Sequence, residues 1–526
     1  MDRDNYVAIA LSVMPRVLSA MDRNEISDTF GCFDKDYWFY KTSDFPCARY
    51  QEPILTLALL YRNRFEKNVY FKNPKVKRWA DAGLEFLTHI QNKDGSFNEW
   101  YPNERSFCAT AFCTYSASET FRLLKYDLKN NDNIVVMLER AGSWLSRNDE
   151  DISNQQAGAI AALYNLYKIT SKGEYKRNAE EKLTKILKTQ SIEGWLPEYG
   201  GADPSYLTVT IDFLGKYFKE SGSKKALDIA LPALKFLKYF LHPDGSIGGI
   251  YGSRNAEIKL PHGLEVFSAL NEDARYLADN IANKIKNTLN PTMMDDRYAF
   301  IYHISYLQAY IEHRPNDNLH SPIHEEENLF DESGLYVRNR GYYIAINLKK
   351  GGVFRLYGNG RIFNDSGIIA TTGDKILTTN CNDSSNYRRQ GNEILVEGCF
   401  KEITSIKRLS PQRNILLRGF LLTMGGSPAI TSRVKEFFRK KLILEAKDSR
   451  VLHKRRFLLD DSKVTVIDEV RVPEDLEIDA FYFPSQFSSS YSPTSAFFDQ
   501  YSLIAGEVDD AEELREGPVR REFILK

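Results

Sequence analysis

Asp94-Gly95-Ser96 is the first of three acid-glycine turns in the first half of this chain; the others are Glu193-Gly194-Trp195 and Asp244-Gly245-Ser246. Each turn ends an amphipathic segment and opens a loop rich in aromatic and charged residues, after which helical spacing of apolar residues resumes. A single Asp-Gly pair is most simply a helix-ending turn. Repetition in the same phase, at a period of roughly fifty residues, favours an array of helical hairpins closed into an α/α toroid.

Apolar residues at three-and-four spacing predict about twelve helices, or six hairpins. They are expected at Asn5–Met21, Tyr50–Phe65, Asn73–Gln91, Phe107–Leu124, Asn131–Leu145, Ile152–Thr170, Gly173–Lys188, Ser205–Glu220, Ser223–Leu241, Pro261–Leu270, Asp273–Thr288 and Asp296–Glu312. The links alternate between short polar ones and long ones. The long links are expected on one face, where binding and catalysis are usually placed: Asp22–Arg49, Asn92–Ser106, Ser191–Pro204 and His242–Leu260.

After Pro315 the pattern changes to β-branched and aromatic residues that alternate with polar ones, which predicts strands. The expected strands are Leu335–Leu348, Gly352–Leu356, Ile394–Gly398, Ile415–Thr423, Arg456–Leu459 and Lys463–Val470. Strands that follow a run of helices indicate a separate domain, most simply an antiparallel β-sandwich. The expected organisation is a toroid over 1–314, a linker over 315–327 and a sandwich over 328–526.

Composition limits the classes of function. The chain has 70 Lys and Arg against 71 Asp and Glu, so nucleic acid is not an expected partner. No segment is apolar enough to span a membrane, and Met1–Met21 lacks the apolar core of a signal peptide, so we expect a cytoplasmic protein. Six sparse cysteines without a Cys-x-x-Cys pair, and histidines without ligand spacing, predict neither metal nor cofactor. The oligomeric state is open.

Most toroids of this kind act on a glycan or an isoprenoid. The stretches Gln91–Phe97 and Gln190–Trp195 are similar to the Gln…Trp repeats of triterpene cyclases. Those enzymes protonate their substrate through an Asp-x-Asp-Asp motif, which this chain lacks, and Asp149-Glu150-Asp151 has a different spacing. A prenyltransferase would need a zinc-binding set of Asp, Cys and His that is also missing from the sequence. A glycan is therefore the favoured ligand.

The long loops supply candidate site residues. Dense polar residues beside glycines in Tyr251–Glu257, followed by Pro261-His262-Gly263, suggest a backbone shaped around a ligand. Sugar rings stack on aromatic side chains, and guanidinium groups pair with carboxylates. For each residue, ordinary loop packing is the competing interpretation. Substrate contacts are predicted for Trp38, Arg49, Trp100, Arg105, Trp195, Glu198, Tyr199 and Asn255, and acid–base roles for Tyr251 and His262.

With these loops, a toroid followed by a sandwich resembles the heparinase II/III-like polysaccharide lyases over nearly the whole chain. Two stretches carry the resemblance: Ile152-Ser-Asn154-Gln155-Gln156-Ala157 and Glu198-Tyr199-Gly-Gly-Ala-Asp203-Pro-Ser-Tyr206. The first is similar to an Asn-His element of these lyases, and the second to the segment with their catalytic tyrosine. The resemblance implies that Asn154 neutralises the carboxylate of a uronic acid and that Tyr206 moves the proton. Gln155 and Arg254 are further candidates for neutralising that carboxylate, because their side chains donate hydrogen bonds. Helix capping is the alternative role for Asn154, and core packing for Tyr206.

The chain also departs from that family. Gln155 stands where the histidine of the Asn-His element would be, and Phe354–Asp365 lacks the histidines of the comparable strand. Three functions stay open: a lyase that uses tyrosine alone, a uronyl C5-epimerase in which Tyr206 works with Tyr251 or His262, and a protein that only binds acidic polysaccharide or oligosaccharide. The basic residues in Arg433–Lys441 and Arg450–Arg456 are expected on a solvated strand face, with polyanion binding as the alternative.

Overall fold

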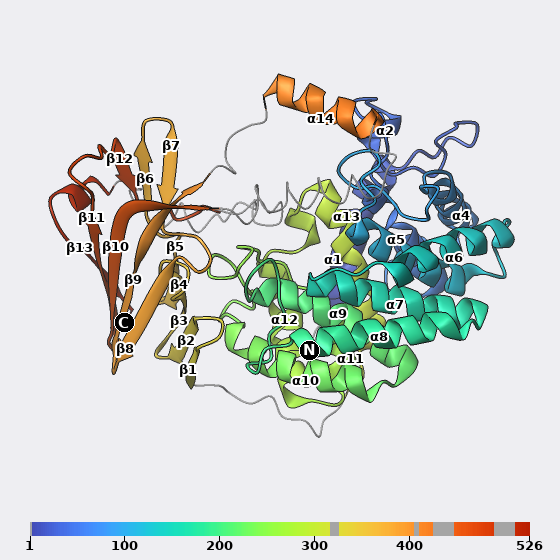
Figure 1. Cartoon of the computed structure of the whole chain (residues 1–526). Coiled ribbons are helices and arrows are strands. Elements are labelled where there is room, and N and C mark those ends of the chain that lie inside the picture. The colour runs from blue at the N-terminus through green and yellow to red at the C-terminus, as the bar shows by residue number, and fades with distance from the viewer. Residues whose placement is uncertain (1–2, 316–325, 404–409, 424–445, 489–510, 526) are drawn as a thin grey trace.

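The computed structural model describes residues 3–315, 326–403, 410–423, 446–488 and 511–525. Helices make up the described N-terminal part, and strands dominate the described C-terminal part (Figure 1). The predicted fold class, a helical toroid followed by an antiparallel β-sandwich, is confirmed by the element order and the sheet topology.

The helices form two concentric layers. Each inner helix packs on the next inner one, and α13 packs on α3, so the ring closes. The inner helices are α3 (Ile54–Arg62), α5 (Phe107–Leu124), α7 (Ser153–Thr170), α9 (Pro204–Ser221), α11 (His262–Ser268) and α13 (Asp296–Glu312). The outer helices are α1 (Asp4–Ala20), α4 (Pro74–His89), α6 (Asn131–Arg147), α8 (Gly173–Thr189), α10 (Lys224–Leu237) and α12 (Glu272–Lys284).

Short helical turns lie in the connections: α2 (Lys35–Trp38), η1 (Ala48–Gln51), η2 (Lys238–Phe240), η3 (Ile285–Asn287) and η4 (Pro291–Met293). The predicted helix Tyr50–Phe65 is divided into η1 and α3, because Pro53 has no N–H to donate where the two meet. Otherwise the predicted helices are found with shifted ends.

The three acid-glycine turns have one structure. The backbone N–H groups of Asn92, Ser191 and His242 each donate to the carbonyl four residues later, over 2.9–3.0 Å. Gly95 has φ +97° and Gly194 has φ +100°, and an added Cβ at either would lie 2.2 Å from a backbone carbonyl of the adjacent outer helix, α6 or α10. Only glycine fits these positions, so the turns fasten each hairpin to its neighbour.

The ring closes through charges at the first helix. Arg3 bonds Glu265 of α11 over 2.9 Å and Asp279 of α12 over 2.6 Å. The Tyr6 hydroxyl donates to the same glutamate, and the His313 ring nitrogen lies 2.8 Å from it. Because Glu265 is fully buried, these partners are what makes its burial tolerable.

The C-terminal part contains two antiparallel sheets. The first has the order β1-β2-β3-β4-β5 and the second β12-β6-β7-β9-β10-β11-β13, with β8 paired to β9. The first sheet consists of β1 (Glu326–Phe330), β2 (Leu335–Arg340), β3 (Tyr342–Asn347), β4 (Val353–Gly358) and β5 (Arg361–Asp365). The second consists of β6 (Ile369–Thr372), β7 (Lys375–Thr378), β8 (Ser385–Gln390), β9 (Glu393–Ile403), β10 (Lys447–Leu459), β11 (Lys463–Arg471), β12 (Ala480–Tyr482) and β13 (Val519–Ile524).

The side chains of β3 alternate between the two faces of the first sheet, and so they pack against both the toroid and the second sheet. Tyr343 and Ala345 pack into the core of the toroid, whereas Ile344 and Ile346 pack into the core between the two sheets. Successive side chains of a strand point to opposite faces, so one sheet covers the toroid and supports the second sheet.

Two strand predictions are wrong. Ile415–Thr423 lies in a helix, α14 (Pro411–Thr423), because Pro411 suits a first helical turn and Ser410 caps it by accepting from the Arg413 N–H. Ile415 is 71% exposed, so the apolar residues of this segment do not form the buried face of a strand. Leu335–Leu348 is a hairpin, β2 and β3, that turns at Gly341 with φ +74°.

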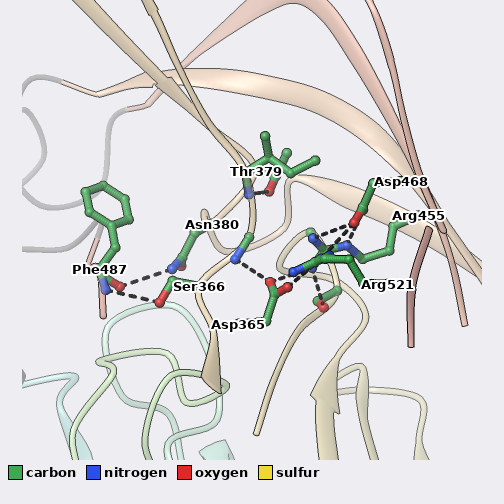
Figure 2. Close-up of polar contacts among 12 residues, drawn as sticks. Asp365, Ser366, Thr379, Asn380, Arg455, Asp468, Phe487 and Arg521 are labelled. Atoms are coloured by element: carbon green, nitrogen blue, oxygen red, sulfur yellow. Dashed lines mark hydrogen bonds and ion pairs between the residues drawn. The ribbon is translucent and has the colours of Figure 1, made fainter. Parts of the chain in front are cut away.

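The expected solvated face over Arg450–Arg456 is also wrong at Arg455, which is 1% exposed; the stretch 433–441 lies outside the described residues. Arg455 bonds Asp468 over 2.6 Å and Asp365 over 2.8 Å, and Arg521 lies 2.7–2.8 Å from the same two aspartates (Figure 2). Two guanidinium groups therefore neutralise two buried carboxylates and join β5, β10, β11 and β13.

Candidate active site

The long loops that precede the inner helices lie side by side. Ala48 donates to Asn98 over 3.0 Å, linking the loops before α3 and α5, and Ser253 donates to Ala202 over 3.0 Å, linking the loops before α11 and α9. The loop before α9 is likewise joined to the start of α7. The predicted gathering of these loops on one face of the ring is therefore confirmed.

Asn154 and Glu198 meet on this face. Asn154, in the first turn of α7, donates its Nδ2 to Glu198 Oε2 over 2.6 Å, and both residues are 3% exposed. Burial raises the pKa of Glu198 to about 8, although Arg254 and the Asn154 amide each favour the ionised form. The carboxyl group is therefore mostly protonated at neutral pH.

Arg254 lies beside the two tyrosines of the loop and helix that follow Glu198. Its guanidinium carbon is 3.9 Å from the centre of the Tyr199 ring and 5.7 Å from that of Tyr206. The residue is only 6% exposed, and among the described residues its Nε and Nη1 have no hydrogen-bond partner. A buried cation with unused donors, held on an aromatic ring, is suited to bind an anionic group of a ligand.

Asp203 fixes the positions of Tyr206 and Arg254. One carboxylate oxygen accepts from the Tyr206 N–H over 3.0 Å and caps α9, and the other accepts from the Arg254 N–H over 2.8 Å. An added Cβ at Gly252 would lie 2.5 Å from this carboxylate, so the loop comes this close only with glycine there. Burial raises the pKa of Asp203 to about 6.

Two tyrosines of α13 add an aromatic wall near Tyr206. Tyr298 and Tyr302 are both largely buried, and the pKa of Tyr302 is raised well above its usual value by burial first and then by Tyr206 and Tyr298. Tyr206 itself is partly exposed, in contrast to the two tyrosines of α13. Of these three tyrosines, Tyr206 is therefore the most accessible to solvent.

A second charged group lies next to this wall. Arg297 of α13 donates to Glu99 over 2.7 Å and stacks on Trp100, with its guanidinium carbon 3.7 Å from the centre of the ring. Arg49 lies 4.0 Å from the same glutamate and donates to the Cys108 thiol over 2.9 Å. Because Trp100 is 44% exposed, it offers a flat surface beside two guanidinium groups.

The β-sandwich holds the loop that carries Arg254. Lys350 donates to the Gly252 carbonyl over 2.7 Å and also contacts Asn255, whose own amide donates to Ser488 over 2.8 Å. Phe487, which precedes Ser488 in the chain, is held by Ser366 and Asn380 through hydrogen bonds to its backbone (Figure 2). Burial lowers the pKa of Lys350 to about 7. Arg254 is thus positioned from both domains.

The prediction that five catalytic candidates share one cleft is wrong for Tyr251 and His262. Tyr251 is fully buried, and its hydroxyl lies 2.7 Å from the His242 ring nitrogen, under the first sheet. His262 is fully buried at the start of α11, with its Nδ1 3.6 Å from Asp212. Asn154, Tyr206 and Arg254 do come together.

The predicted substrate contacts divide in the same way. Glu198, Tyr199 and Asn255 belong to the group around Arg254, and Trp100 is exposed and stacks on Arg297. The others make contacts within the protein: Trp38 donates to the Ala20 carbonyl, Arg49 pairs with Glu52, Arg105 pairs with Asp94, and Trp195 donates to Glu193.

Sequence reasoning missed Tyr298, Tyr302, Arg297 and Lys350. The three α13 residues had a signal, since a helix with four tyrosines and few charges is unusual on a solvated surface. Lys350, between two strands, had none, because only the folded chain brings it against the 250–255 loop.

Within the part of the chain that the structure describes, there is no group of three His, Cys, Asp or Glu side chains that could hold a metal ion. The described helices likewise include none that is long and apolar enough to cross a membrane.

Comparison with known proteins identifies the fold. The chain is similar to the chondroitin AC lyase of Streptomyces coelicolor A3 in complex with chondroitin sulphate, with a TM-score of 0.57 and 10% identity over 90% of this chain and 67% of that one. A mutant of the same lyase gives a TM-score of 0.52, again at 10% identity. Heparinase III gives a TM-score of 0.47 at 12% identity, over 80% of this chain and 62% of that one. No family model and no curated protein sequence matches. The chain therefore has the α/α-toroid and β-sandwich fold of a polysaccharide lyase.

Proposed function

We propose that this protein cleaves a 4-linked uronic acid polysaccharide by β-elimination, with Asn154, Arg254 and Tyr206 as the acting residues. The observation that carries the proposal is the buried Arg254 guanidinium, which has unused donors and lies on Tyr199 next to Tyr206. The fold shared with chondroitin AC lyase supports it.

The chemistry requires the C5 proton of the uronic acid to leave and the C4–O bond to break. The proton is acidic enough only when the neighbouring carboxylate is neutralised, so that negative charge can spread onto it. Arg254 and Asn154 supply donors for that carboxylate. Tyr206, as the phenolate, takes the C5 proton, and the electron pair forms the C4–C5 double bond as the C4–O bond breaks. Tyr206 then returns the proton to the departing oxygen.

Incubation of the protein with a panel of uronic acid polymers in deuterated water distinguishes elimination from epimerisation. Elimination yields an unsaturated uronate, whereas epimerisation yields C5 deuterium without cleavage. The two buried residues, Tyr251 and His262, are poorly placed as the second acid–base group of an epimerase. Deuterium at C5 of uncleaved polymer would contradict the elimination proposal.

Arg254→Ala is expected to weaken binding of a uronic acid oligosaccharide about tenfold, because a hydrogen bond to a charged group is lost in the ground state. Turnover should fall as well. Titration calorimetry measures the dissociation constant. The control is Arg140→Ala, an exposed arginine on the outer helix α6, which should bind as the unchanged protein does. Equal binding by both variants would contradict a carboxylate contact at Arg254.

Asn154→Ala is expected to lower kcat about tenfold and to change KM little, because its donor matters most as charge grows on the carboxylate. Steady-state rates over a range of substrate concentrations separate the two constants. Asn148→Ala, at the end of α6, is the matched amide deletion and should leave both constants unchanged. A rise in KM with unchanged kcat would assign Asn154 to binding alone.

A further inference from the structure

The backbone of Glu198 is held firmly, but only one oxygen of its carboxyl group has a hydrogen-bond partner. The backbone N–H donates to the Gly201 carbonyl over 2.9 Å, and the backbone carbonyl accepts from the Ser253 hydroxyl over 2.7 Å. Oε2 accepts from Asn154, whereas Oε1 is buried without a hydrogen-bond partner among the described residues. An unsatisfied buried polar atom is costly unless a ligand completes it.

The charged groups with the largest effect on this carboxyl come from the loops before α7, α9 and α11. Arg254 lies in the loop before α11, Asp203 lies in its own loop before α9, and Glu150 lies just before α7. Desolvation outweighs the attraction of Arg254, which is why the pKa of Glu198 rises to about 8. Since Oε2 is taken by an N–H donor, the proton belongs on Oε1, where it has no acceptor within the described protein.

The donors around this point face no acceptor. Arg254 has unused Nε and Nη1, and protonated Glu198 has an unused O–H. We propose that Glu198, in its protonated form, donates a hydrogen bond to the carboxylate of the substrate, which Asn154 and Arg254 also hold. The inference deepens the proposed function and rests on it, since it names the group that makes the site select an acidic sugar.

Protonation of Glu198 decides whether the anion is bound or repelled. An O–H···O⁻ bond to a carboxylate is short and strong, and it gains strength as charge accumulates on the substrate during C5 deprotonation. Ionised Glu198 would instead place a second negative charge beside the substrate. Binding of a uronic acid must therefore be accompanied by proton uptake once the pH exceeds the pKa of this residue.

The test is calorimetric binding of a chondroitin hexasaccharide at pH 7 and pH 9, in buffers that differ in ionisation enthalpy. The protein should take up about one proton on binding at pH 9, and its affinity should fall roughly tenfold per pH unit above about 8. Glu198→Gln keeps the shape and a donor, so it should bind within about threefold of the unchanged protein at pH 7 and show neither effect. Lys350 and Asp203 are unaltered in that variant, so their titration cannot explain a difference. Glu181→Gln, at an exposed glutamate of the outer helix α8, is the control and should behave like the unchanged protein. Cellohexaose, which has no carboxylate, should not cause proton uptake.

The outcomes separate this inference from the proposed function. Binding at pH 9 without proton uptake, or equal uptake by Glu198→Gln, overturns the role of Glu198 and leaves the elimination proposal intact. A hundredfold loss of turnover in Glu198→Gln with normal binding would also overturn it, because it would make Glu198 the base. Binding with uptake but no cleavage supports the inference and contradicts the proposed function. Absence of binding by the chondroitin hexasaccharide, and by hexasaccharides of every other polymer in the uronic acid panel, contradicts both.

Stability provides a readout that does not depend on substrate. The folded-state pKa of Glu198 lies above the unfolded value, so its contribution to stability is fully present below about pH 4.5 and is lost as the pH rises to about 8. Glu198→Gln has no ionisation to resist. From pH 5 to pH 9, the denaturation midpoint of Glu198→Gln should therefore rise relative to that of the unchanged protein. If the two midpoints changed with pH in parallel, Glu198 would not be protonated in the native state.

Discussion

Tyr206→Phe is expected to lower turnover at least about a hundredfold, the lower end of what a general acid–base group contributes. The substitution keeps the aromatic ring beside Arg254 and removes only the ionisable hydroxyl. Binding of a uronic acid oligosaccharide should change little, because the contacts of Arg254 and Asn154 are retained. Initial rates of cleavage and calorimetric affinities measure the two effects separately.

Tyr175→Phe is the matched control. Tyr175 lies on the outer helix α8, where its hydroxyl donates to the Glu139 carbonyl, so its loss should leave turnover unchanged. If Tyr206→Phe cleaved substrate as fast as this control, the tyrosine mechanism would be wrong. The proton acceptor would then have to be sought among Tyr199 and the tyrosines of α13.

Arg455→Ala is expected to destabilise the protein by about 3–5 kcal/mol, because it leaves Asp365 and Asp468 buried with only Arg521 as a cation. Chemical denaturation followed by tryptophan fluorescence and circular dichroism measures the shift. Arg456→Ala, at the next residue, removes a half-buried arginine that lies 3.2 Å from Glu393, and should cost about 1 kcal/mol or less.

The effect of Arg455→Ala depends on pH in a definite direction. Arg455 and Arg521 hold the pKa of Asp365 below its usual value, so this group stabilises the native state above its unfolded pKa of about 3.9 and ceases to do so as the pH falls through its folded pKa. The difference between the unchanged protein and Arg455→Ala should shrink below about pH 4. A constant difference would contradict the assignment of the loss to unpaired carboxylates.

The helical part of the fold was predictable because its signals are local. Gly95 and Gly194 stand at the same place in two successive repeats, because each contacts the backbone of the next outer helix too closely for any other residue. The repeat is therefore visible in a single sequence, without an alignment. Strands gave a weaker signal: Ile415 and its neighbours are apolar yet exposed on α14, and the residues that start this helix, Ser410 and Pro411, lie just before the apolar run.

The site was predictable where a residue's own segment decides its position. Asn154 begins an inner helix, and Tyr206 begins another after an Asp203 cap, so both had to face the loops. Tyr251 has the same local features but is buried under the first sheet, a long-range contact that a single sequence does not reveal. Glu198 was predicted to contact substrate, while its burial and partner Asn154 became visible only in the structure.

The most direct test of the proposed function is the absorbance of an unsaturated uronate during incubation of the protein with uronic acid polymers, chondroitin among them. We predict a rise in absorbance with shortening of at least one polymer, and no rise for a neutral glucan or for Tyr206→Phe. An unchanged absorbance across the whole panel, from protein shown to be folded, would contradict elimination as its function.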